Sequence, residues 1–169
     1  VEAAQQEAES PFASAGGENP YAIHADLQQT MNDLVGIIRT AAEVEKAIQR
    51  LDDLKERARK VSVQGDKVFN PGWHLALDLP NMLLVSECIA RSALMREESR
   101  GGHTRDDFPQ MSDEWRKVNL VCRPDGDGVS VEQQPLPVMP PELLSLFDRD
   151  ELSKYMTDAE LAILPEGNA

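Results

Sequence analysis

The chain has 169 residues, of which 41% are hydrophobic and only 5% aromatic, and its formal net charge is −13. This length is enough to bury a real core, and the low aromatic content favours packed helices over a β-sandwich. The acidic residues are concentrated in residues 1–19 and 125–169, and no basic stripe is present. This pattern argues against binding to nucleic acid or to an anionic membrane surface. No apolar run approaches the roughly 20 residues of a membrane span.

The first half of the sequence predicts an arm and two amphipathic helices. Residues 1–20 are rich in Ala, Gln, Glu, Ser and Gly, so we expect a linker or an extended arm. Apolar residues at steps of three and four then predict helices at about 22–39 and 42–61. Thr40 stands where it could cap the second helix. The first apolar stripe is Ile23, Leu27, Met31, Leu34 and Ile38.

A third helix is predicted from about Asp78 to Arg100. Glycine, proline and asparagine residues in 62–76 predict a loop before it, and Asp78 could cap it with Pro80 in the first turn. Gly101 and Gly102 are expected to end it. Its apolar residues cover more than half of its circumference, which is typical of a central helix. These residues are Leu83, Leu84, Val85, Cys88, Ile89, Ala90, Leu94 and Met95.

The remainder of the chain has a different character. Short strand-like runs at 118–123 and 129–133 are separated by turn residues and predict a β-hairpin. The prolines of 135–141 predict an extended stretch. A short helix is expected at 141–148, and another after Thr157, which begins a capping-box sequence.

Together these elements predict a mainly α protein. Its centre is a spectrin-like up-down-up three-helix bundle, followed by a C-terminal β-hairpin and a Pro-rich extended tail. We divide the chain into an arm (1–20), the bundle with a charged loop (21–110), and a last part (111–169). In the last part, the hairpin, the Pro-rich tail and the short helices are expected to pack on the bundle.

The two cysteines, Cys88 and Cys122, form neither a CxxC pair nor a metal-ligand spacing. Isolated cysteines in an acidic chain are expected to be reduced, buried residues of a cytoplasmic protein. An iron–sulfur cluster requires about four thiolates, so the sequence predicts no such cluster in this chain.

The densest cluster of charged residues runs from Arg96 to Pro109. Glu97 and Glu98 lie at the helix end whose dipole favours cations, and the nearby arginines could offset them. Two interpretations remain open: a self-paired ionic loop, or a docking strip for another domain or subunit. No Gly-x-Ser-x-Gly or Gly-x-Gly-x-x-Gly motif is present, so we expect neither catalysis nor nucleotide or metal binding here. The candidate docking or structural residues are Arg96, Glu98, Ser99, Arg100, Gly101, His103, Arg105 and Asp107.

This region is similar to the C-terminal domain of the succinate dehydrogenase and fumarate reductase flavoprotein family. The chain has Ala-Leu-Met-Arg96, then Glu98-Ser-Arg-Gly-Gly-His103, followed by Arg105 and Asp107-Phe-Pro109. The family has Glu-Ser-Arg-Gly-Ala-His at this place, so Gly102 is a departure that leaves the turn intact. The resemblance covers about residues 22–141.

The resemblance implies a supporting role in a larger enzyme. The parent flavoprotein subunit would interconvert succinate and fumarate by hydride transfer with FAD and pass electrons to an iron–sulfur subunit. We expect no FAD, metal or catalytic residue in this chain itself. Expected partners are the FAD-binding and capping domains of the same subunit and the iron–sulfur subunit, with no nucleic acid and no direct membrane insertion. The expected location is the cytoplasm, peripheral to the inner face of the cell membrane through the complex.

Two alternatives remain. The chain could be the C-terminal domain of an L-aspartate oxidase, which shares the helices and a Glu-Ser-Arg-Gly loop, although Arg105 and the Pro-rich tail favour the respiratory enzyme. It could also be a non-enzymatic helical module for protein interaction.

Overall fold

The computed structural model describes residues 1–169 except 14, 15, 127, 163 and 165–169. The chain forms two compact units, Val1–Gln134 and Pro135–Ala169. Seven α-helices and two two-stranded sheets are present among the described residues, so the prediction of a mainly helical protein is confirmed. The predicted division at residues 110 and 111 lies before the boundary between these units, and that division stays a prediction.

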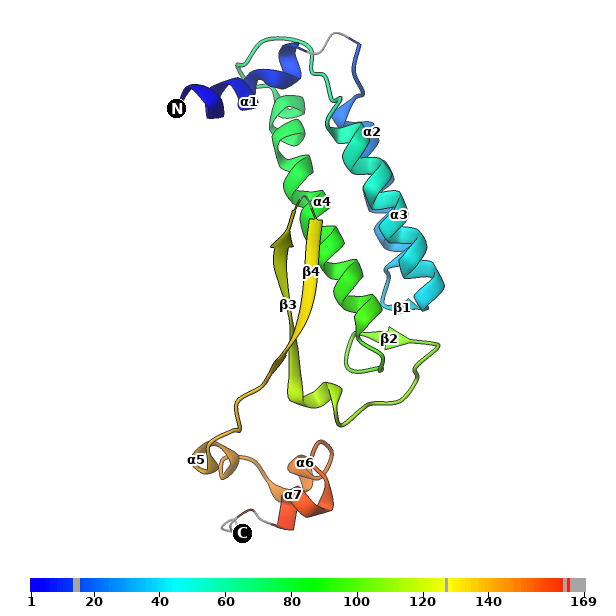
Figure 1. The fold of residues 1–169 in the computed structure, drawn as a ribbon, viewed down its shortest axis with the longest axis vertical. Helices are drawn as coiled ribbons and strands as arrows, with labels where there is room; N and C mark the ends of the chain where they lie inside the picture. Colours follow the sequence, from blue (N-terminus) through cyan, green and yellow to red (C-terminus); the bar gives the residue numbers. More distant parts are fainter. Residues whose placement is uncertain (14–15, 127, 163, 165–169) are drawn as a thin grey trace. The chain divides into compact units, whose positions relative to one another are not determined.

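Three long helices pack around one core in the first unit. They are α2 (Pro20–Leu34), α3 (Ala41–Ala58) and α4 (Pro71–Met95), and they lie side by side with successive helices running in opposite directions (Figure 1). The apolar stripes predicted from the sequence supply most of the buried side chains. The core consists of Ile23, Leu27, Val35, Val44, Ala47, Leu51, Leu54, Val61, Ala76, Leu79, Leu83 and Ala90.

Side chains cap the N-termini of α2 and α3. Asn19 accepts a hydrogen bond from the Tyr21 amide at 2.9 Å, and Pro20 occupies the first helical position. Thr40 forms a full capping box with Glu43 at the start of α3, so the predicted role of Thr40 as a cap is confirmed.

The sequence-based boundaries of the third helix were wrong at both ends. Helix α4 begins at Pro71, not at Asp78, because the Asn70 side chain accepts from the Trp73 amide at 3.0 Å and Pro71 fills the first position. Pro80 therefore lies inside the helix, on an exposed surface where a missing backbone N–H is tolerated. The helix ends at Met95 rather than Arg100 because the Arg105 side chain binds its last carbonyl groups.

Residues 2–13 form helix α1 (Glu2–Ala13), which differs from the predicted linker or extended arm. Ala, Gln and Glu have high helix propensity, and this segment also has a tertiary anchor. The Trp73 indole donates to the Ala8 carbonyl at 2.7 Å, and the rings of Phe12 and Trp73 lie 5.4 Å apart. A short helix of marginal intrinsic stability is therefore held by contacts with the start of α4.

Two small sheets complete the first unit. Strand β1 (Ile38–Arg39) pairs in parallel with β2 (Thr104–Arg105), which joins the α2–α3 connection to the segment after α4. After a 3₁₀ turn, η1 (Trp115–Lys117), strands β3 (Val118–Asp125) and β4 (Gly128–Pro135) form the predicted hairpin. The hairpin lies along α4 (Figure 1).

The second unit contains short helices. They are α5 (Pro141–Leu144), α6 (Arg149–Leu152) and α7 (Asp158–Ala162). The predicted capping box at Thr157 is present, with the Thr157 amide 2.9 Å from a Glu160 carboxylate oxygen. The helix predicted at 141–148 ends at Leu144, and α6 was not predicted, because a four-residue helix carries no periodic signal.

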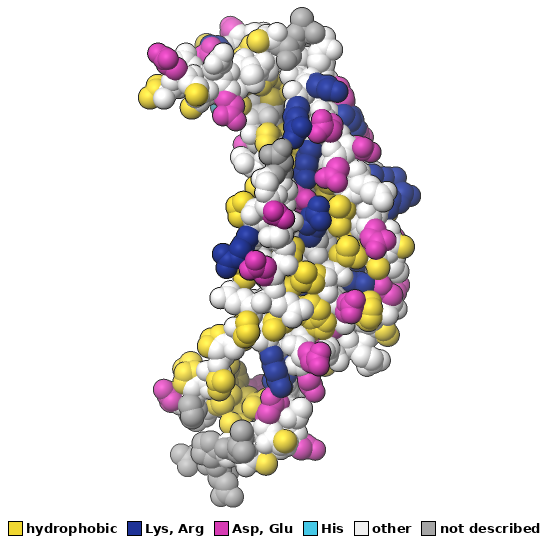
Figure 2. All heavy atoms as spheres, viewed as in Figure 1, with side chains coloured by type: hydrophobic (Ala, Val, Ile, Leu, Met, Phe, Trp, Pro, Cys, Tyr) yellow, Lys and Arg dark blue, Asp and Glu magenta, His cyan; other side chains and the backbone are white. Residues whose placement is uncertain are grey.

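Charged side chains of both signs cover the helices on the face shown in Figure 2. Within the described part of the chain, no helix is long and apolar enough to cross a membrane.

The Thr40 capping box gives a direct test of how the start of α3 is stabilised. We expect Thr40→Ala to lower the free energy of unfolding by about 1 kcal/mol, because the Glu43 amide loses its side-chain acceptor. Thr40→Ser keeps the hydroxyl and should stay within about 0.5 kcal/mol of the wild type. Chemical denaturation measures both, and equal losses for the two variants would contradict the assignment.

Candidate functional site

The loop that follows α4, residues 96–109, is termed the charged loop here, and its three arginines form ion pairs with acidic residues of the same loop. Glu98 is fully buried and accepts hydrogen bonds from the Arg96 Nη1 at 2.6 Å and the Arg100 Nη2 at 3.1 Å. The Ser112 amide also donates to it at 2.9 Å. Burial alone would raise the pKa of Glu98, but the bonds from Arg100, the Ser112 amide and Arg96 lower it overall. Glu98 is therefore an ionised carboxylate held between two guanidinium groups.

Arg105 is only 1% exposed, and its guanidinium binds in two directions. Its Nε and Nη2 form a bidentate pair with the Asp107 carboxylate, each at 2.7 Å. Its Nη1 donates to the carbonyls of Ala93 and Leu94, both at 2.9 Å. The last carbonyls of a helix lack intrahelical donors and carry partial negative charge, so a buried cation there is favourable.

Asp107 extends this connection to a second helix. Its Oδ2 accepts from the backbone amide of Ala41, the first residue of α3, at 3.0 Å. The hydrogen bonds from Arg105, and to a smaller extent the one from the Ala41 amide, lower the pKa of Asp107 well below its usual range. One ion pair thus joins the C-terminus of α4 to the N-terminus of α3, with each charge at the helix end that favours it.

Polar groups of the loop fix its backbone around this pair. The Ser99 hydroxyl accepts from the Arg105 amide at 2.8 Å and lies 2.9 Å from the Phe108 carbonyl. Gly101 adopts a left-handed φ of +59° in the turn between Arg100 and His103, whose backbones exchange two hydrogen bonds.

His103 supports the same turn from its side chain. Its Nε2 lies 3.1 Å from the Arg96 carbonyl, so this nitrogen carries the proton and donates it. Burial, followed by the neighbouring Arg39 and Arg105, lowers the pKa of His103 in spite of that bond. A neutral His103 ring avoids charge repulsion with Arg39, Arg96 and Arg105, which surround it.

The structure brings all eight predicted loop residues into this one region. Sequence reasoning missed Ser112, which binds Glu98, and Trp115, whose ring lies 5.3 Å from the Arg96 guanidinium. Both contacts span many residues, so no local spacing could have indicated them. Among the described residues, no group of three or more His, Cys, Asp or Glu side chains could hold a metal ion. A docking role for the loop stays a prediction.

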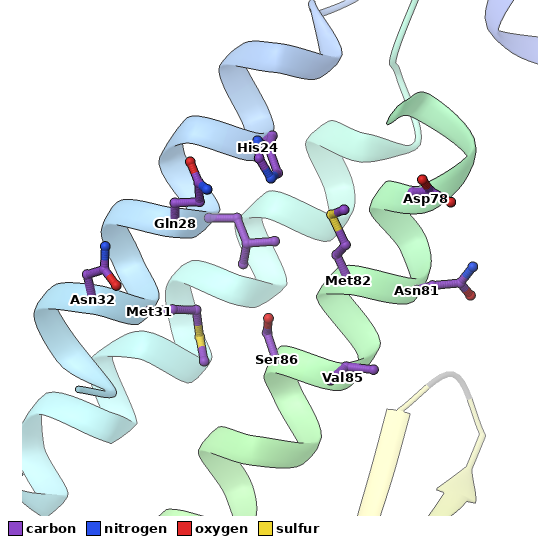
Figure 3. Close-up of a pocket in the computed structure, with 10 residues that line it drawn as sticks. His24, Gln28, Met31, Asn32, Asp78, Asn81, Met82, Val85 and Ser86 are labelled. Carbon is purple, nitrogen blue, oxygen red and sulfur yellow. The ribbon is translucent and has the colours of Figure 1, made fainter. Parts of the chain in front are cut away.

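A second feature is an open groove of about 630 Å³ between α2 and α4. In Figure 3, side chains of α2 face side chains of α4 across it, and thioether, amide and aliphatic groups line it. The lining residues include His24, Gln28, Met31, Asn81, Met82 and Val85.

The groove continues onto an apolar surface of α4. Leu84, Val85 and Ile89 are 48%, 57% and 48% exposed, although the sequence predicted α4 to be a central helix with these residues in its core. Only part of the apolar circumference of α4 is covered by α2, α3 and the hairpin. The sequence pattern alone could not distinguish these exposed apolar residues from residues of the core.

The Glu98 carboxylate should be essential for the stability of the charged loop. We expect Glu98→Gln to lower the free energy of unfolding by about 3 kcal/mol, because it leaves Arg96 and Arg100 without their shared counter-charge. Glu132→Gln is the matched control, since it removes an exposed pair with Arg123 and should cost less than about 1 kcal/mol. Equal losses in urea denaturation would contradict this role.

The same carboxylate predicts how stability depends on pH. The folded-state pKa of Glu98 is lowered, so its contribution is present above the usual carboxyl pKa of about 4 and is lost as the pH falls below it. We expect the wild type and Glu98→Gln to differ most near neutral pH and to converge below about pH 4. Urea titrations across this range measure the gap, and a gap independent of pH would contradict the assignment.

The chain matches one known protein family along most of its length. The family model described as "Fumarate reductase flavoprotein C-term" matches residues 24–145. The fumarate reductase flavoprotein subunit of Helicobacter pylori is 33% identical over 132 residues, covering 76% of this chain and 18% of the relative. The fumarate reductase flavoprotein subunit of Mycobacterium tuberculosis is 35% identical over 129 residues, covering 76% of this chain and 22% of the relative.

Solved structures give the same result. Mycobacterium smegmatis Sdh1 in complex with UQ1 is 54% identical, with a TM-score of 0.88, and the match covers 98% of this chain and 28% of that chain. The E. coli quinol fumarate reductase FrdA with an E245Q mutation is 30% identical with a TM-score of 0.72, covering 81% of this chain and 24% of that chain. The chain thus spans less than a third of the relatives it matches, and since the family model covers most of the chain, the protein belongs to the family of fumarate reductase flavoprotein C-terminal domains.

Proposed function

We propose that this chain is the C-terminal accessory domain of a succinate dehydrogenase or fumarate reductase flavoprotein subunit. The parent subunit interconverts succinate and fumarate by hydride transfer with FAD and passes electrons to an iron–sulfur subunit. The observation that carries this proposal is the match along nearly the whole chain to the Mycobacterium smegmatis structure, of which it covers 28%. The complex lies at the inner face of the cell membrane, with this domain on its cytoplasmic side.

The residues described here do not fit FAD. A dinucleotide pyrophosphate is usually bound by free amides at a helix N-terminus beside a Gly-rich turn. The N-termini of the three long helices are instead occupied by Asn19, Thr40 with Asp107, and Asn70. We therefore assign FAD to the remainder of the subunit and propose a structural contribution for this domain.

We infer that α2, α3 and α4 form the up-down-up three-helix bundle and that the charged loop fixes its end. Arg105 and Glu98 are buried, with their hydrogen-bonding groups directed at partners in the same chain. This favours the structural interpretation of the eight loop residues over docking through the arginine side chains.

The apolar face of α4 is the surface that we assign to docking, with the FAD-binding part of the same subunit as its occupant. Leu84, Val85 and Ile89 are about half exposed, and the groove beside them is lined largely by apolar and amide groups. More than two thirds of the matched subunit lies outside this chain. Since that remainder belongs to the same polypeptide, it is present at the same concentration as this domain and can cover such an apolar face. The iron–sulfur subunit is the second partner of the assembled complex.

The test is a charge introduced into this face of the full-length subunit. We expect Val85→Glu to reduce FAD incorporation and succinate oxidation several-fold, because docking would bury an unpaired carboxylate. Val85 is exposed in this domain, so the substitution should leave the domain itself folded.

Gln49→Glu is the matched control, because it adds the same charge to an exposed position of α3. This variant should retain wild-type flavin content and activity. If Val85→Glu behaved like Gln49→Glu in both measurements, the α4 face would not be the docking surface.

A further inference from the structure

The cysteines of α4 and β3 lie together, although 34 residues separate them in the sequence. The Cys122 sulfur is 3.9 Å from the Cys88 carbonyl oxygen and 3.4 Å from the Ser92 hydroxyl, one helical turn further along α4. Burial, followed by the neighbouring Cys122 thiol, raises the pKa of Cys88. Cys122 therefore lies over the turn of α4 that carries Cys88, a proximity that the sequence spacing did not indicate.

Both cysteines are also partly exposed. Cys88 and Cys122 are free and only partly buried, and neither belongs to the hydrophobic core, whereas the sequence predicted buried residues. Free thiols on adjacent surfaces of two packed elements are suited to forming a disulfide, since one can attack the oxidised form of the other.

We propose that Cys88 and Cys122 form a modification site, a thiol pair that a small hydroperoxide oxidises to an intramolecular disulfide. One cysteine, as the thiolate, attacks the peroxide, takes one oxygen to become a sulfenic acid, and releases water or an alcohol. The other thiol then attacks that sulfur, and the sulfenic oxygen leaves as a second water. The peroxide is reduced by two electrons, and both protons of the thiols end in the released products.

A disulfide requires the two sulfur atoms to come to about 2.05 Å from each other. Cys122 lies in a hairpin whose sheet has two strands among the described residues, so β3 is held by one neighbouring strand there. The disulfide would tether the hairpin to α4 beside the proposed docking face, a restraint separate from the charged loop.

The experiment uses the full-length subunit treated with hydrogen peroxide, alkylated in denaturant, and digested with trypsin without reduction. Cleavage sites at Lys67 and Arg91 release one cysteine, and sites at Lys117 and Arg149 release the other, since Arg123 precedes a proline. We expect mass spectrometry to find residues 68–91 linked to residues 118–149, with loss of the link on reduction. The yield should exceed that of protein oxidised in urea by about tenfold, because the native contact raises the effective concentration of the thiols.

Cys88→Ser and Cys122→Ser are the matched controls and should each lose the linked species. The proposal would be overturned if the folded wild type yielded only separate peptides, whether alkylated or oxidised to sulfinic acid on single cysteines. An equal yield of the link in folded and unfolded protein would overturn it too. Neither result bears on flavin content, so failure here is distinguishable from failure of the proposed function.

Discussion

The end of the helical assembly depends on one ion pair, between the buried Arg105 and Asp107. Arg105 satisfies carbonyls at the C-terminus of α4, and Asp107 accepts from the first amide of α3. Helix ends are costly to bury when their backbone groups are unpaired. Here the partial negative charge at the end of α4 stabilises Arg105, and the partial positive charge at the start of α3 stabilises Asp107. The parallel pairing of β1 with β2 places Arg105 opposite Arg39 and holds the loop in the register that this arrangement needs.

Burial of Arg105 removes the hydration of its charge, so the ion pair contributes little to stability compared with an apolar replacement. Its value here lies in specificity. Apolar side chains at the end of α4 would tolerate sliding of the helix along its neighbours, whereas the bidentate geometry of Arg105 and the buried position of Glu98 permit one arrangement. The charged loop thus sets which arrangement of the helices is stable, while the core supplies most of the free energy.

The parts of the fold that follow a local rule could be predicted from sequence. The stripes at Ile23, Leu27 and Leu51, the Thr40 box and the hairpin all have spacings of a few residues, and each is present. The start of α4 was misplaced because Asn70 and Asp78 are both acceptable caps followed by prolines. Its end was misplaced because the group that terminates it, Arg105, acts from beyond the helix. The charged loop was found as a motif, but its partners Ser112 and Ala41 are distant in sequence and leave no local signal.

In helix α4, the apolar composition predicts more buried residues than the structure of this domain shows. One side of it packs in the core through Leu79 and Leu83. The opposite side meets the hairpin near Ser92, where Cys122 makes contact. Val85 and Ile89 lie on this same side and are about half exposed, although their composition is that of a core helix. Burial of such a surface would be favourable in water, which is the reason for the docking role that we propose for this face. Contacts with α2, α3 and the hairpin hold part of the surface of α4 in place, whereas the part with Val85 and Ile89 remains exposed to solvent in this domain.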